Sequence, residues 1–260
     1  MPRTIALNTI AYQQVMKENS TIRQAELLHE IKSVGIDYVE IRREFVTDGE
    51  EELKQTAEIA KKEQVKLFYS VPDDLFKDNE VNPVLEDYFK EAELLHALQM
   101  KVTLGDLEKL TKEIAEKIKR LLNQFTTKLL IENDQSNERG SSSRLKAFME
   151  EAAEFDLSLG LTFDVANFVY FDENPIESAK VLRPFVQYVH IKNVKKQGEK
   201  LEATDMESGD LDIRSILNQF SEDVPCAIEY PCGEQNKIKQ KIEHDKNELQ
   251  SWAPSQSNIG

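Results

Sequence analysis

Four polar side chains stand at the ends of short apolar segments in the second half of the chain: Glu132, Asp164, His190 and Glu229. Each directly follows an apolar residue, and successive ones are separated by about one strand–helix unit of roughly 30 residues. Three carboxylates and one imidazole make a mixed oxygen and nitrogen donor set. Such a set suits one divalent ion, either Mn²⁺, Mg²⁺ or Co²⁺, with Zn²⁺ as a further candidate although no thiolate favours it. Without an ion, converging carboxylates would repel one another and raise each other's pKa.

Taken singly, each of these residues has an ordinary structural interpretation. Glu132 could pair with a lysine, and Asp164 could cap a turn. His190 could be a hydrogen-bonded core histidine, and Glu229 could accept a backbone amide. Their equivalent placement at four strand ends favours a shared metal site over four separate explanations.

Short segments rich in β-branched and aromatic residues alternate with longer amphipathic segments along the whole chain. Eight strands are expected, at 4–8, 37–42, 65–70, 99–104, 128–133, 159–164, 187–193 and 226–230. Eight helices are expected between and after them, at 21–35, 50–63, 82–98, 106–125, 141–155, 174–185, 210–220 and 235–251. Strict alternation predicts parallel strands with helical crossovers, and eight units in about 250 residues predict a (β/α)₈ TIM barrel. An open doubly wound sheet is the alternative, but no G-x-G-x-x-G sequence follows the first strand.

The parity of the strand residues predicts which side chains point into such a barrel. Successive side chains of a strand lie on opposite faces. In "KLLIEN" (128–133), Glu132 shares a face with Leu130, and the apolar Ile131 lies on the other. The segments that carry Asp164 and His190 follow the same rule. All four polar side chains are therefore expected inside the barrel at the carboxyl ends of the strands, where barrel active sites lie.

Composition limits the partners of the protein. The formal net charge is −15, which disfavours nucleic acid and anionic lipid surfaces. The sequence has no apolar run long enough for a membrane span and no signal-peptide pattern at its start. Its two cysteines do not form a disulfide framework, so a cytoplasmic protein is expected. No linker divides the chain, so we expect one domain over residues 1–252 and a flexible tail at 253–260.

Five segments together resemble the xylose isomerase-like TIM barrel superfamily, in particular its sugar phosphate isomerase/epimerase family. They are "GIDYVEIRRE" (35–44), "LLIEN" (129–133), "LGLTFDVANF" (159–168), "YVHIKNV" (188–194) and "CAIEYP" (226–231). Each motif is weak alone, but their order and spacing are specific, and the resemblance spans nearly the whole chain.

The resemblance implies a chemistry for the four residues. Family members bind one divalent ion through Glu, Asp, His and Glu at these strand ends, and these fall on Glu132, Asp164, His190 and Glu229. In the ketose-epimerase branch the two glutamates are also the acid/base groups, and the ion stabilises an enediolate. A lyase that dehydrates a keto-polyol at the same site is an alternative, and a non-catalytic carbohydrate-binding barrel is another. A homodimer is an open alternative to a monomer.

Further positions are candidates for binding a carbohydrate substrate. Epimerases of this family carry a histidine where this chain has Asn167, a glutamate that matches Glu138, and an arginine where this chain has Lys196. Arg42 could hold a phosphate or carboxylate, or pair with Glu40 on the inward face of its strand. Lys192, two residues beyond His190, could contact substrate hydroxyls or the ligand cluster.

Overall fold

Eight parallel strands form a closed barrel in the computed structural model, which describes residues 2–198 and 200–252. The barrel strands are β1 (Ile5–Asn8), β2 (Tyr38–Arg42), β3 (Lys66–Lys77), β5 (Gln99–Gly105), β6 (Lys128–Glu132), β7 (Leu159–Asp164), β8 (Val186–Ile191) and β11 (Cys226–Ile228). Each pairs with its neighbour, and the pairing of β2 with both β1 and β3 closes the ring. The closure excludes an open doubly wound sheet and confirms the predicted TIM barrel.

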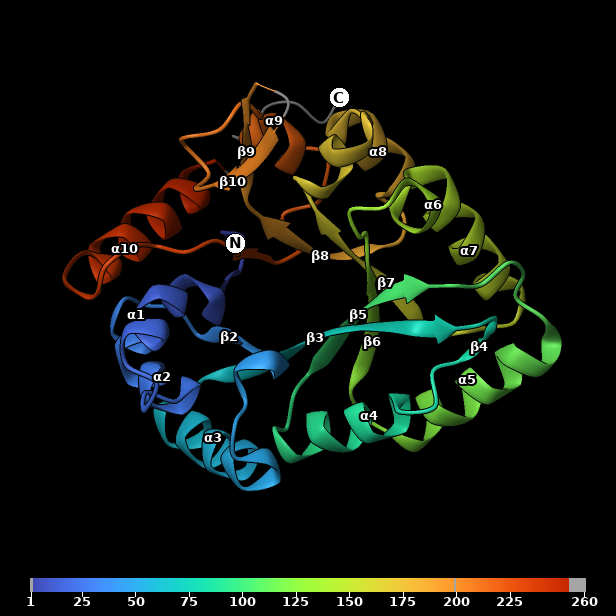
Figure 1. Cartoon of the computed structure of the whole chain (residues 1–260), viewed down its shortest axis with the longest axis horizontal. Helices are drawn as coiled ribbons and strands as arrows, with labels where there is room; N and C mark the ends of the chain where they lie inside the picture. The colour runs from blue at the N-terminus through green and yellow to red at the C-terminus, as the bar shows by residue number, and fades with distance from the viewer. Residues whose placement is uncertain (1, 199, 253–260) are drawn as a thin grey trace.

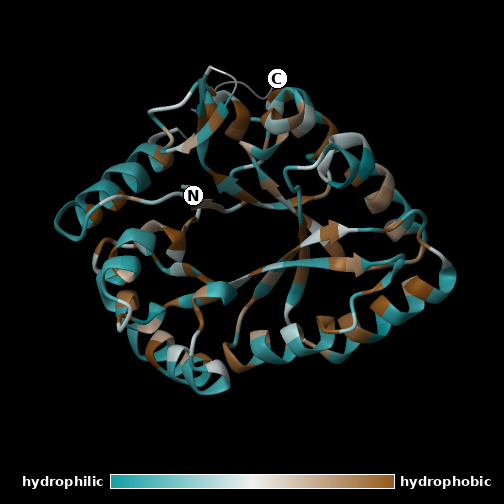
Figure 2. Ribbon diagram, viewed as in Figure 1, coloured by the Kyte–Doolittle hydropathy of each residue, from teal (hydrophilic) through white to brown (hydrophobic). Residues whose placement is uncertain are grey.

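The helices surround the strands (Figure 1). The α-helices are α1 (Gln13–Glu18), α2 (Gln24–Ser33), α3 (Gly49–Glu63), α4 (Leu85–Leu94), α5 (Lys112–Gln124), α6 (Asn137–Gly140), α7 (Ser142–Glu154), α8 (Pro175–Leu182), α9 (Ile213–Leu217) and α10 (Gln235–Ser251). Short 3₁₀ helices are η1 (Thr9–Tyr12), η2 (Arg43–Phe45) and η3 (Asn167–Phe171). Apolar residues on these helices pack against the barrel, while hydrophilic residues cover much of the outer surface (Figure 2). No helix of the described residues is long and apolar enough to cross a membrane.

The inside of the barrel has a polar layer at the carboxyl ends of the strands and an apolar layer next to it, toward the amino ends. Phe68, Leu130, Tyr188 and Ala227 belong to a small apolar cluster that is separate from the main core. Because side chains two residues apart share a face, the next inward positions on these strands are Ser70, Glu132, His190 and Glu229. The main core lies between strands and helices and includes the intervening apolar residues Ile131, Val189 and Ile228. The parity prediction therefore matches the packing.

Regular structure also occurs in segments where no strand or helix was expected. The strand expected to end at residue 70 continues as β3 to Lys77, where it pairs with the short antiparallel strand β4 (Glu80–Val81). Gly105, the last residue of β5, permits the close approach of β5 to β3, since a Cβ there would lie 2.1 Å from the carbonyl oxygen of Phe76. The segment between the strand expected at 187–193 and the helix expected at 210–220 contains most of a hairpin formed by β9 (Asn193–Gln197) and β10 (Lys200–Thr204).

Some helix boundaries were wrong. The helix expected over 106–125 begins only at Lys112, because the Thr111 side chain caps it by accepting the amide of Ile114. The helix expected over 210–220 is the single short α9, capped by Asp212. The helix expected over 21–35 begins at Gln24, three residues after Thr21, and ends at Ser33. The tail expected at 253–260 lies outside the described residues.

Candidate metal centre

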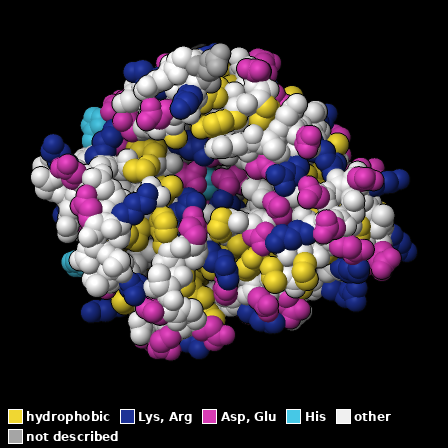
Figure 3. All heavy atoms as spheres, in the orientation of Figure 1, with side chains coloured by type: hydrophobic (Ala, Val, Ile, Leu, Met, Phe, Trp, Pro, Cys, Tyr) yellow, Lys and Arg dark blue, Asp and Glu magenta, His cyan; other side chains and the backbone are white. Residues whose placement is uncertain are grey.

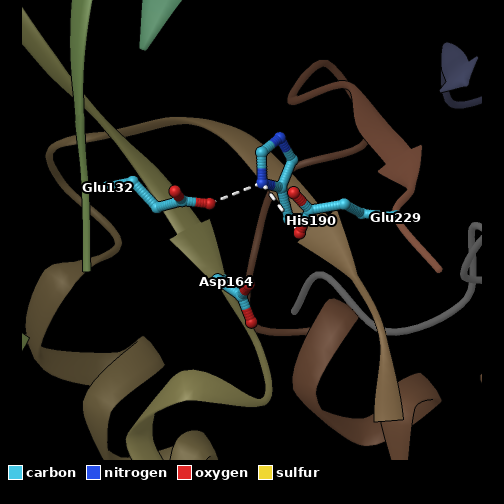
Figure 4. Close-up of side chains that lie close together, drawn as sticks. All are labelled: Glu132, Asp164, His190 and Glu229. Atoms are coloured by element: carbon cyan, nitrogen blue, oxygen red, sulfur yellow. Dashed lines mark hydrogen bonds and ion pairs between the residues drawn. The ribbon is translucent and has the colours of Figure 1, made fainter. Parts of the chain in front are cut away.

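Adjacent strands bring the four predicted ligand residues together at one end of the barrel. Glu132 ends β6, Asp164 ends β7, His190 lies in β8, and Glu229 follows β11 directly. Asp164 is the register partner of His190 across the β7–β8 pair. All four are buried, and one potential ligand atom from each lies within 4.8 Å of the others. Figure 4 shows their side chains converging on a common centre.

Asp164 shows how a ligand is oriented here. Its Oδ1 accepts the backbone amides of Ala166 and Asn167 at 2.9 and 3.2 Å. This turn after β7 fixes the carboxylate and leaves Oδ2 for the shared centre. Burial of the carboxylate raises the pKa of Asp164 to about 6, although the ammonium of Lys192 opposes the shift.

His190 is held from behind by Glu40. The Nε2 atom lies 2.8 Å from Glu40 Oε2, which also accepts the hydroxyl of Tyr188 at 3.0 Å. With its proton on Nε2, the ring would bind a metal ion through Nδ1, and a carboxylate behind a histidine is the usual way to orient a metal ligand. Nδ1 lies 2.6 Å from Glu132 Oε1 and 3.2 Å from Glu229 Oε2.

The two glutamates each bind a cation through one oxygen. Glu132 Oε2 accepts a short hydrogen bond from the ammonium of Lys101. Glu229 Oε1 accepts one from Arg42 Nη1 at 3.1 Å. The other oxygens, Glu132 Oε1 and Glu229 Oε2, face His190.

Charge balance keeps the two glutamates ionised. Burial favours their neutral forms, but Lys101 and His190 outweigh it and lower the pKa of Glu132 to about 2. His190 and Lys192 likewise hold the pKa of Glu229 well below its usual value. Burial disfavours the charged imidazole, yet the surrounding carboxylates, with Glu229 foremost, raise the pKa of His190 well above its usual value.

The ammonium of Lys192 lies beside the same centre. Its Nζ is 2.5 Å from Asp164 Oδ2 and 3.8 Å from Glu229 Oε2. Despite this proximity, neither oxygen makes a hydrogen bond of acceptable geometry with any described residue. Two buried carboxylate oxygens without hydrogen bonds, beside an imidazole nitrogen that already contacts two carboxylates, fit a divalent cation. Glu132, Asp164, His190 and Glu229 are the residues that would hold it.

The other predicted site residues lie at different distances from the four ligand residues. Arg42 and Lys192 point into the polar cluster, with side chains 15% and 16% exposed. Asn167 is buried, and its amide nitrogen donates to the carbonyl of Asn133 at 2.7 Å. Glu138 is exposed on α6, and Lys196 is exposed on the β9–β10 hairpin. In the space-filling view, acidic and basic side chains gather around a hollow near the centre of the face shown (Figure 3).

Lys101 escaped the sequence reasoning, and Glu40 has a different partner from the one considered. Lys101 was not singled out, although a lysine between Met100 and Val102 in an apolar strand is an inward position by parity. A pair with Glu40 was one of the two alternatives considered for Arg42. Instead Glu40 binds His190, and Arg42 binds Glu44 and Glu229.

A family model described as xylose isomerase-like TIM barrel matches residues 28–251. The chain therefore belongs to the xylose isomerase-like TIM barrel family. Among curated proteins, no sequence matches this chain.

Solved structures show the same fold at low sequence identity. D-psicose 3-epimerase with D-tagatose from Clostridium cellulolyticum H10 has a TM-score of 0.69 at 9% identity, covering 98% of this chain and 100% of that one. The IOLI protein with a binding zinc atom has a TM-score of 0.69 at 18% identity, with 98% and 100% covered. The probable 3-DHS dehydratase AsbF from Bacillus anthracis has a TM-score of 0.64 at 14% identity, with 94% and 98% covered. At these identities the likeness establishes the fold alone.

Proposed function

We propose that the protein is a divalent-metal-dependent sugar or sugar-phosphate isomerase or epimerase that works through an enediolate. One observation carries the proposal. Each of the four buried ligand residues has one polar atom held by a protein partner and another facing the shared centre. The epimerase neighbours of the same fold and the family membership support it.

A bound divalent ion would acidify the C–H next to a substrate carbonyl and stabilise the enediolate as a Lewis acid. The residues of the chain supply the rest of the chemistry. Glu132 and Glu229 are the proposed acid/base pair, and β7 and β8 separate their strands around the barrel. One carboxylate takes the proton from carbon, and the same or the other returns it. Return to the opposite face is epimerisation, and return to the neighbouring carbon is isomerisation.

Basic side chains at the centre are the proposed substrate-binding groups. Lys192 and Arg42 lie beside the ligand oxygens and can donate to substrate oxygens that gain negative charge. Asn167, Glu138 and Lys196 are proposed contacts farther along the substrate.

The two cysteines, Cys226 and Cys232, are free thiols, and we propose a cytoplasmic location on that basis.

Deuterium exchange tests this function directly. The protein is supplied with Mn²⁺ and incubated in D₂O with a panel of ketoses, aldoses and inososes, and NMR follows the carbon next to the carbonyl. We expect exchange with at least one substrate, and loss of exchange in Glu132→Gln, in Glu229→Gln or in both, at matched metal occupancy. No exchange with any candidate would overturn the proposal.

A lyase that dehydrates a keto-polyol is a second candidate for the same site. It is favoured by three cationic side chains around the ligands, those of Arg42, Lys101 and Lys192, because they suit an anionic substrate. The dehydratase neighbour is consistent with it. Product mass separates the two, since only the lyase releases water from its substrate.

A further inference from the structure

Lys192 pairs with oxygens that a metal ion at this centre would need. Its ammonium makes its closest ion pairs with Asp164 Oδ2 and Glu229 Oε2, at 2.5 and 3.8 Å. The opposite oxygen of each carboxylate is already held, by backbone amides in Asp164 and by Arg42 in Glu229. An ion held by these residues would therefore need the two oxygens that Lys192 now neutralises.

Lys101 provides an internal comparison. Its side chain is 8% exposed against 16% for Lys192, it carries the same charge, and it also pairs with a ligand residue. However, it holds Glu132 through Oε2, whereas Oε1 is the oxygen that lies 2.6 Å from His190 Nδ1. Lys101 thus orients a ligand without covering the atom that faces the centre.

We propose that Lys192 is an internal counter-ion that a divalent ion must displace from Asp164 and Glu229. The inference rests on the proposed metal site and deepens it. In the metal-free protein the ammonium neutralises carboxylates that would otherwise repel one another. If an ion took these oxygens, the ammonium would lose both of its closest ion-pair partners, and an anionic oxygen of the substrate would replace them. The same residue then sets the metal affinity and readies the loaded site for an anionic group.

Metal titration of four proteins tests the competition. Mn²⁺ affinity is measured by calorimetry on metal-free wild type, Lys192→Met, Lys192→Gln and Lys101→Met. Removing the competing charge should tighten Mn²⁺ binding by about tenfold or more in both Lys192 variants. Lys101→Met should bind no more tightly than wild type, since Glu132 loses its orienting partner. The glutamine variant keeps a polar side chain and serves if the methionine variant does not fold.

Thermal unfolding gives an independent readout. Without metal, the Lys192 variants should unfold at a lower temperature than wild type, and Mn²⁺ should raise their midpoint more than it raises that of wild type. Equal tightening in the Lys101 and Lys192 variants would show a general charge effect and overturn the proposal, as would weaker binding in the Lys192 variants. If wild type itself bound neither Mn²⁺ nor Zn²⁺, the proposed function would fail together with this inference.

Discussion

The contact between Glu40 and His190 predicts that a residue outside the ligand set controls the metal affinity. Glu40 is 1% exposed, and its Oε2 accepts from both His190 Nε2 and the Tyr188 hydroxyl. Glu40→Gln retains the shape and a carbonyl acceptor for Nε2–H but loses the charge that increases the basicity of the ring. Glu40→Ala loses the acceptor as well and frees the imidazole to rotate.

The size of the effect follows from this difference. Mutation of the hydrogen-bond partner of a metal-binding histidine typically weakens metal affinity by about 10- to 100-fold, or roughly 1.4 to 2.8 kcal/mol. We expect Glu40→Gln near the lower end and Glu40→Ala near the upper end. Tyr188→Phe removes one hydrogen bond from Glu40 but leaves the contact with the ring, so its effect should be small.

Competition against a chelating dye measures the Mn²⁺ affinity. ¹⁵N NMR of the Zn²⁺-loaded protein, which has only 4 histidines, reports the tautomer of His190. A proton on Nε2 is expected in wild type and Glu40→Gln, and a mixture in Glu40→Ala. Glu63→Gln is the matched control, because Glu63 pairs with His29 at 3.0 Å while the His29 side chain is 81% exposed. Wild-type affinity in both Glu40 variants would refute the positioning role.

Three further predictions follow from single contacts. Wild-type protein should purify with up to one divalent ion per chain and Glu132→Gln with much less, as measured by elemental analysis; equal occupancy would remove Glu132 from the ligand set. Burial opposes the charge of Asp73, but hydrogen bonds from Lys77 and Tyr88 outweigh it and lower the pKa of Asp73 to about 2. Because the folded-state pKa is depressed, the Asp73 carboxylate contributes to the free energy of unfolding above its unfolded pKa near 4, and this contribution disappears as the pH falls towards 2. For a partly exposed group the contribution is about 1 kcal/mol. Urea unfolding of Asp73→Asn should therefore differ from that of wild type at pH 7 and become equal to it in acid. Phe148 is fully buried and packs edge-on against Phe76, so Phe148→Ala should lower the free energy of unfolding by about 3–5 kcal/mol, whereas a loss below about 1 kcal/mol would contradict the packing.

The predicted ligand set shows what strand periodicity can establish. Glu132, Asp164 and His190 could be placed together because strand side chains alternate strictly and parallel strands end at a common edge. Only local sequence is needed for that inference. Whether these residues hold a metal is a separate question, which the titrations above address.

Contacts between distant strands could not be predicted in the same way. A pair between Arg42 and its neighbour Glu40 was considered, yet the Arg42 guanidinium reaches Glu229, 187 residues away. Which inward charge meets which depends on the stagger of the strands around the barrel, and residue parity does not determine the stagger. The extension of β3 to Lys77 has a similar origin, since it requires a register shift against β5 between Ser70 and Asp74.

The way in which the ligands are held bears on whether the centre is catalytic. Lys101 and Arg42 each occupy one oxygen of a glutamate, and the turn after β7 occupies one oxygen of Asp164. Each carboxylate therefore has one oxygen left, and with His190 Nδ1 the chain offers four donor atoms. Mg²⁺ and Mn²⁺ favour six ligands, so two positions would remain for substrate oxygens, whereas a four-coordinate structural Zn²⁺ would be saturated. Lys101 and Arg42 thus restrict each glutamate to one free oxygen. This arrangement favours an open centre, as the proposed binding of a carbonyl and its neighbouring hydroxyl would require.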